Sequence, residues 1–169
     1  MNQAIELLDK EHKFILTAIE KADALFNSVI SGDSDISGMK KFIEFFRNYT
    51  DKYHHQKEEE ILFPEMSKRN ELLEDGVIKE MFENHEDFRE MMRNIESEID
   101  NNNVDSAYKL FNEYSEALKD HIAVEDDEVF QMAESLMSDD EMDNIYFRFL
   151  DNDRELGDKE KSDMEEWIK

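Results

Sequence analysis

The sequence contains no cysteine, one proline and four glycines in 169 residues. Without cysteine, the chain has no disulfide, no thiolate zinc site, no iron–sulfur cluster and no thiol nucleophile. So few prolines and glycines leave few positions for tight hairpin turns, which disfavours an all-β fold. No hydrophobic run approaches the ~20 residues of a membrane span, and the N-terminal residues do not resemble a signal peptide. We therefore expect a cytoplasmic protein with no membrane partner.

Positive charge is also scarce, since 45 acidic residues face 20 basic ones and the formal net charge is −25. Such a surface repels phosphates, so we expect no nucleic-acid partner. Hydrophobic residues make up 39% of the chain and aromatic residues 11%, which is typical of a folded protein. The length suits one domain with a substantial core. Most carboxylates are expected to face water, so acidity alone does not indicate a metal site.

Four long segments carry apolar residues at alternating spacings of three and four, which is the pattern of one helical face. The expected helices cover residues 2–30, 37–70, 77–100 and 105–137. Pro64 is expected to break or kink the second helix near its end. Ser138 and Glu141 form a capping-box pattern that opens a shorter fifth helix, followed by a charged tail.

Short connections between long amphipathic helices favour antiparallel neighbours. The predicted fold is therefore all-α, an up-down-up-down antiparallel four-helix bundle with a short C-terminal fifth helix. We assign residues 1–137 to the bundle and expect residues 138–169 to pack on the same domain.

The placing of the histidines is the most informative feature. Four of the five lie in or beside the apolar face of a different helix: His12, His54, His85 and His121. A buried imidazole needs a hydrogen-bond or metal partner, because burying it unpaired is costly. At about 1.5 Å per residue, the two histidines of each helical hairpin fall within roughly one turn of the same level. The match between the second and third helices is looser and relies on a break at Pro64.

Two carboxylates share helix faces with these histidines, because Glu58 follows His54 by four residues and Glu125 follows His121 by four. Glu59 and Glu60 are expected to face water. Four imidazoles and two bridging carboxylates suit two divalent ions. In the absence of sulfur ligands iron fits best, with manganese and zinc as alternatives.

His55 is expected to point about 100° away from its neighbour His54, which favours a position at the surface or behind the ligands. A direct ligand role for His55, or for Asp126, stays open.

At these positions the sequence resembles the hemerythrin-like family, also called the HHE cation-binding domain. Residues 54–64 read HHQKEEEILFP, which looks like the HHxxEExxLFP signature of its second helix, and residues 121–130 resemble the paired signature of the fourth. The resemblance covers roughly residues 1–155 and implies a four-helix bundle around two iron ions with an oxo or hydroxo bridge. It also implies binding of oxygen, nitric oxide or peroxide.

The sequence departs from the oxygen-carrying hemerythrins at two positions. Met81 stands where their third helix has the first histidine of HxxxH, and Glu125 matches better than Asp126 for the last carboxylate. These departures argue against reversible oxygen carriage and favour the branch linked to iron sensing, nitric oxide handling and iron-centre repair. The repair proteins usually bring a cysteine-containing N-terminal segment, whereas these 169 residues contain no cysteine.

Three hypotheses follow. The first is a protein that binds oxygen or nitric oxide, or senses iron, through a di-iron centre. The second is an enzyme that uses the same centre to act on nitric oxide or peroxide. The third is a metal-free helical adaptor. The sequence alone does not choose between binding and turnover.

Overall fold

The computed structural model describes residues 2–169. These residues form no β-strand, so the part of the chain described is all-α, as predicted. Two short 3-10 turns, η1 (Ile36–Gly38) and η4 (Glu71–Leu73), lie in the connections between helices.

The described chain contains six continuous helical segments. The first is α1 (Gln3–Ile30), and the third is α4 (Val77–Asp100). The second combines α2 (Met39–Phe45), η2 (Phe46–His55), η3 (Glu58–Leu62) and α3 (Phe63–Arg69). The fourth combines α5 (Val104–Val124), η5 (Glu125–Val129) and α6 (Phe130–Leu136). The last two are α7 (Asp139–Leu156) and α8 (Asp158–Ile168).

Local sequence explains several helix ends. The side chain of Asn2 accepts a hydrogen bond from the backbone N–H of Ala4 and caps α1. Both bonds of the predicted capping box between Ser138 and Glu141 are present at the start of α7. Gly157 separates α7 from α8 with a φ of 116°, a conformation that favours glycine.

The C-terminal part of the chain differs from the predicted single short helix. It contains two helices, because the sequence pattern of the tail is too charged to reveal α8 by its apolar positions. The second helical segment ends at Arg69, close to the predicted end at residue 70, and it is continuous through Pro64 rather than broken there. Proline is tolerated there because it occupies the first turn of α3, directly after the π-helix η3.

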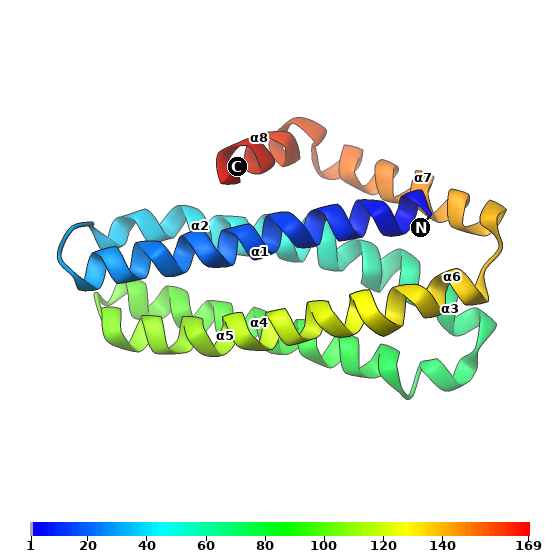
Figure 1. Cartoon of the computed structure of the whole chain (residues 1–169), viewed down its shortest axis with the longest axis horizontal. Helices are drawn as coiled ribbons and strands as arrows, with labels where there is room; N and C mark the ends of the chain where they lie inside the picture. The colour runs from blue at the N-terminus through cyan, green and yellow to red at the C-terminus, as the bar shows by residue number, and fades with distance from the viewer. Residues whose placement is uncertain (1) are drawn as a thin grey trace.

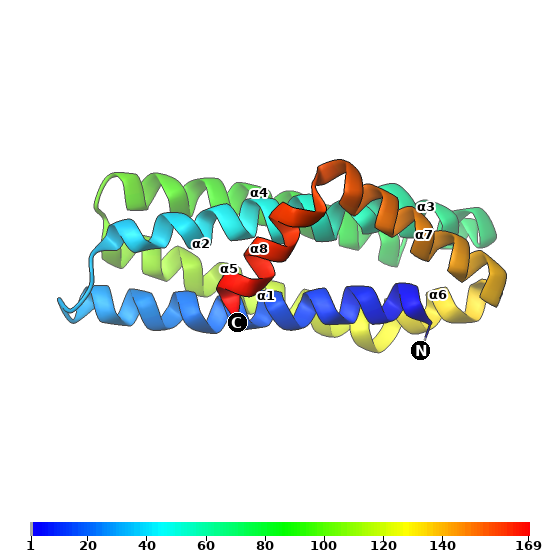
Figure 2. The same cartoon turned by 90° about the horizontal axis from the view of Figure 1, so that it is seen from above.

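Successive long segments run in opposite directions, with α1 beside α2 and α4 beside α5 (Figure 1). The helices α7 and α8 cover one side of this arrangement. Seen from above, α8 crosses the second segment toward α1 (Figure 2). None of the helices described in residues 2–169 has a stretch long and apolar enough to cross a membrane.

Two apolar clusters fill the interior, one toward each end of the long segments. In α1, Leu8 belongs to one cluster and Ile15 to the other, with the buried His12 between them. The same alternation occurs in α4, where His85 lies between Met81 and Phe88. The core is therefore divided by a layer of buried polar side chains.

Candidate metal centre

The polar layer holds two groups of side chains whose donor atoms all lie within 4.8 Å of one another. The first group consists of His55, Glu58, His85 and His121, and the second of His12, His54, Glu58 and Glu125. Every member is buried, and Glu58 belongs to both groups. All six residues predicted as ligands are therefore brought together, and one residue, His55, joins them.

Many of these donor atoms have no hydrogen bond. Seven of the eleven buried side-chain nitrogen and oxygen atoms without a partner in residues 2–169 belong to the two groups. They are His12 Nε2, His54 Nε2, His55 Nδ1 and both carboxylate oxygens of Glu58 and of Glu125. Buried polar atoms are normally paired, because an unpaired one costs about 1–3 kcal/mol. Such a concentration is typical of a site that binds a cation.

The spacing of the donor atoms fits metal coordination. Two ligand atoms about 2.1 Å from one ion, at right angles, lie about 3 Å apart. His12 Nε2 is 3.2 Å from Glu125 Oε2, and His121 Nε2 is 2.9 Å from Glu125 Oε1. Glu58 lies 3.4 Å from His54 through Oε1 and 3.4 Å from His85 through Oε2. Each carboxylate thus contacts two imidazoles, as a bridging ligand would.

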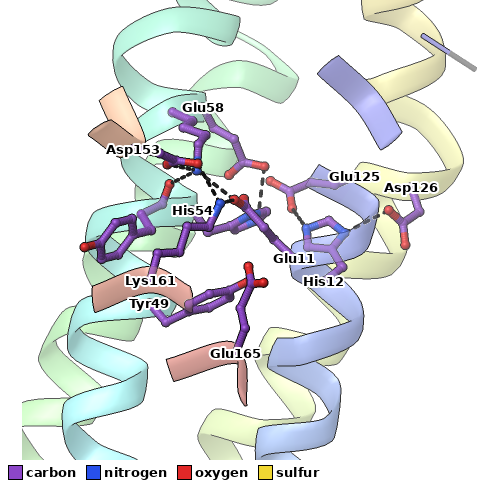
Figure 3. Close-up of polar contacts among 12 residues, drawn as sticks. Glu11, His12, Tyr49, His54, Glu58, Glu125, Asp126, Asp153, Lys161 and Glu165 are labelled. Carbon is purple, nitrogen blue, oxygen red and sulfur yellow. Dashed lines mark hydrogen bonds and ion pairs between the residues drawn. The ribbon is translucent and has the colours of Figure 1, made fainter. Parts of the chain in front are cut away.

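Three imidazoles are oriented by carboxylates that bind Nδ1, the nitrogen opposite Nε2. His12 pairs with Asp126 at 2.9 Å, His54 with Glu11 at 2.9 Å and His85 with Glu59 at 2.8 Å. A carboxylate that accepts the Nδ1 hydrogen fixes the tautomer and leaves the Nε2 lone pair for a metal. Figure 3 shows the first two of these contacts, in which His12 and Glu11 are the residues that belong to α1.

His121 has an amide in the corresponding place, because the Asn84 side chain lies 3.1 Å from its Nδ1. The Nε2 atoms of His85 and His121 are 3.1 Å apart. Two unprotonated nitrogens at this distance repel unless a proton or a cation lies between them. A shared metal ion satisfies both lone pairs.

The electrostatics of the metal-free protein favour uptake of positive charge. Burial raises the pKa of Glu58 well above its usual range, and the nearby Glu125 and Glu11 raise it further. Burial acts on Glu125 in the same direction, but His121 and His12 outweigh it and hold the pKa of Glu125 well below its usual range. Two adjacent buried carboxylates thus retain a proton that a divalent cation would displace.

The pKa values of the histidines are also shifted in opposite directions. Burial, together with the charge of His12, lowers the pKa of His54 to about 3. Burial also lowers the pKa values of His55 and His85 to about 3. Burial opposes protonation of His12 as well, but hydrogen bonds to Asp126 and Glu125 raise its pKa to about 9. Three of the rings are therefore neutral, the form in which imidazole binds a metal.

The prediction that His55 lies at the surface or behind the ligands is wrong about the surface. Its side chain is 2% exposed, and its ring stacks on that of His85 with centroids 3.9 Å apart. The cause is the π-helix η2, whose i→i+5 hydrogen bonds turn the chain by less than the ~100° per residue of an α-helix. His55 therefore follows His54 into the interior.

Glu59 was expected to face water, and this is also wrong, since it binds His85 Nδ1 and accepts a hydrogen bond from Arg89. Sequence reasoning likewise gave no role to Glu11, which is fully buried and binds His54. The signal for Glu11 was its place next to His12 on the apolar face of α1. Asp126, left open as a ligand, lies instead on the Nδ1 side of His12.

A cavity of about 290 Å³ opens beside the first group. Its lining includes His55, Phe88, Tyr114 and the buried hydroxyl of Thr50, which has no hydrogen-bond partner within residues 2–169. Arg89 lies at the same cavity and pairs with Asp51. The site therefore has adjacent room for a small molecule.

Comparison with known proteins agrees with this geometry. The model of the hemerythrin HHE cation-binding domain matches residues 3–133. No curated protein and no solved structure matches the chain significantly. The match includes all of the buried donor residues and covers most of the chain. The chain therefore belongs to the hemerythrin HHE cation-binding domain family.

Proposed function

We propose that the protein binds two iron ions in its polar layer and uses them to bind oxygen or nitric oxide, or to sense iron, in the cytoplasm. The observation that carries the proposal is the concentration of unpaired buried side-chain atoms in the residues of the two groups, above all the Nε2 atoms of His12 and His54 and the carboxylate oxygens of Glu58 and Glu125. Manganese and zinc accept similar ligands, but histidine with carboxylate and no sulfur suits iron well. The four segments that supply the ligands would be the four-helix bundle of the family.

The residues have distinct roles in this proposal. His12 and His54 would hold one ion, and His85, His121 and His55 the other, with Glu58 and Glu125 bridging them. Bound iron would supply an open coordination position and a change of oxidation state. The protein supplies neutral imidazoles, a fixed spacing and an apolar cluster on each side of the polar layer.

The cavity supports a small ligand. Phe88 and Tyr114 contribute aromatic surface to its lining, while Thr50 and His55 offer buried polar atoms. Charged side chains, among them Arg47, Asp51 and Arg89, make up much of the remaining lining, so the cavity suits a small polar molecule. A diatomic molecule or peroxide would reach the His55 side of the centre by this route.

The first experiment is to measure iron content and the optical spectrum before and after exposure to oxygen. An oxo-bridged ferric pair gives near-ultraviolet charge-transfer bands, which zinc does not. We expect His54→Ala and Glu58→Ala to abolish these bands. Glu60→Ala should keep them, because the Glu60 side chain is exposed and, among the residues described, accepts a hydrogen bond from Gln56 alone. Equal loss in all three variants, or no loss in any, would contradict the assignment.

An enzyme acting on nitric oxide or peroxide is the alternative with the same centre. The two are separated by mixing the ferrous protein with either molecule and identifying what leaves. Release of the unchanged molecule indicates binding, and a reduced product with repeated turnover indicates catalysis. If protein purified with and without oxygen holds no stoichiometric metal, the metal-free adaptor is favoured instead.

A further inference from the structure

A second polar cluster lies beside the metal centre and has no assigned role. It consists of four buried charged residues, Glu11, Lys57, Asp153 and Lys161, which we call the ion-pair cluster. The negative charges of the two carboxylates equal the positive charges of the two ammonium groups. Charged side chains are almost never this buried unless they are paired, so each member of the cluster depends on the others for its position.

The cluster joins elements that are distant in the sequence. Glu11 belongs to α1 and Lys57 to the second helical segment, while Asp153 and Lys161 belong to α7 and α8. Asp153 and Lys161 lie outside residues 3–133, the part matched by the family. The C-terminal helices therefore add two of the four charges.

The cluster reaches the metal centre through Glu11, whose two carboxylate oxygens face different partners. Oε1 accepts hydrogen bonds from Lys57 and Lys161, and Oε2 pairs with Nδ1 of His54 at 2.9 Å (Figure 3). Lys161 also binds Asp153 at 2.6 Å. A single carboxylate thus connects α8 to one of the proposed iron ligands.

Other contacts hold α8 in this position. Tyr53 donates a hydrogen bond to the backbone oxygen of Gly157, 2.8 Å away, at the turn between α7 and α8. Tyr49 donates to Glu165 at 2.8 Å, and Ile168 is buried in the same apolar cluster as Tyr49. The helix is therefore docked on the segment that carries His54.

We propose that α8 helps to assemble the metal centre: through Lys161 it holds the Glu11 carboxylate where it binds and orients His54. Lys161 is a positioning residue, since it touches neither metal nor ligand. By linkage, docking of α8 and binding of metal favour each other by the same factor. The effect on metal affinity rests on the function proposed above, whereas the orientation of His54 does not.

The test compares Lys161→Met with Lys159→Met, a matched change on the same helix. Lys159 is exposed, and Asp163 is its only ion-pair partner within residues 2–169. Loss of a carboxylate that orients a metal ligand typically lowers affinity 10- to 100-fold. Lys161→Met keeps this carboxylate, and Lys57 still binds its Oε1, so we expect a loss of about 10-fold in ferrous iron affinity, the lower end of this range. Lys159→Met should leave the affinity unchanged. Lys161→Arg should restore most of the affinity, because it retains the charge.

Because iron binding and docking of α8 favour each other, the stability of α8 provides a second measurement. In the wild type, anaerobic loading with ferrous iron should slow hydrogen exchange of the amides in residues 158–168 by about 10-fold. In Lys161→Met this slowing should disappear. Far-ultraviolet circular dichroism checks that each variant is folded. If Lys161→Met is too unstable, Tyr53→Phe removes the contact at the turn without changing charge and should reduce the slowing.

A third measurement separates this proposal from the proposed function. In metal-free protein labelled with ¹⁵N-histidine, the Nδ1 hydrogen of His54 should give a downfield signal. Lys161→Met should shift or broaden it, and Lys159→Met should not. If wild type binds no iron but the signal depends on Lys161, the proposed function fails and the positioning role stands. An unchanged signal together with unchanged iron affinity in Lys161→Met would overturn the role of α8.

Discussion

Replacing Glu58 by glutamine separates the metal-binding role of this side chain from any structural role. Both carboxylate oxygens of Glu58 are buried without a hydrogen bond, and burial followed by the charges of Glu125 and Glu11 raises its pKa. Glutamine keeps the shape, carries no charge and offers an N–H donor to Glu125. The metal-free variant should therefore be as stable as the wild type or more stable, within about 1 kcal/mol.

The iron-loaded proteins should behave differently. A metal present at 1,000 times its dissociation constant stabilises the folded state by about 4 kcal/mol. For a chain of this size, that corresponds to a rise in Tm of about 8–16 °C. The wild type should show this rise, and Glu58→Gln should lose most of it because a bridging ligand is gone. Glu60→Gln is the matched control and should retain the full rise.

The assay is thermal and urea unfolding under nitrogen, with and without ferrous iron and a chelator. The pH dependence adds a further check. Since the pKa of Glu58 is raised, the folded metal-free protein keeps a proton above pH 4.5 that the unfolded chain releases. Wild-type stability should therefore fall as pH rises above 4.5, and Glu58→Gln should lack this contribution. An iron-dependent rise in Tm that persists in Glu58→Gln would refute the reasoning.

Three further predictions concern neighbouring residues. His55→Leu should reduce bound iron from about two ions per chain toward one, as measured by metal analysis; retention of two would exclude His55 as a ligand. Glu59→Gln should lower iron affinity about 10- to 100-fold by releasing the Nδ1 hydrogen of His85, whereas Glu60→Gln should not. Glu65 pairs with Lys68 and, across to α7, with Arg148; hydrogen bonds from both lower its pKa to about 2. Its stabilisation is present above pH 4.5 and is lost as pH falls toward 2, so Glu65→Gln should cost about 1 kcal/mol at pH 7, after allowance for solvent screening, and almost nothing near pH 2. A urea-unfolding difference that does not narrow with falling pH would contradict this.

Local periodicity predicted much of the helical framework and the layer of donors. His12, His54, His85 and His121 each lie on the apolar face of a helix, and their distance from the nearest turn fixes their height. Glu58 follows from its spacing to His54 alone. These features depend on helical geometry, which the chain specifies over a few residues.

The inward position of His55 and the role of Glu59 depended on the tertiary structure. The π-helical turns η2 and η3 change the angular spacing of side chains, and no regular pattern of apolar residues reveals them. Glu59 lies in a run of four charged residues, of which packing buries Lys57 and Glu58 and leaves Glu60 exposed.

The ion-pair cluster also could not be predicted from the sequence, because its members are far apart along the chain. Lys161 and Glu11 are 150 residues apart, and their contact exists only because α8 folds back across the second helical segment. In a tail rich in charge, nothing in the sequence distinguishes this buried lysine from the exposed Lys159. The sequence by itself determined which residues face inward from each long helix. Only the tertiary structure decided which charged side chains pair in the interior, because burial of a charge depends on partners that other helices supply.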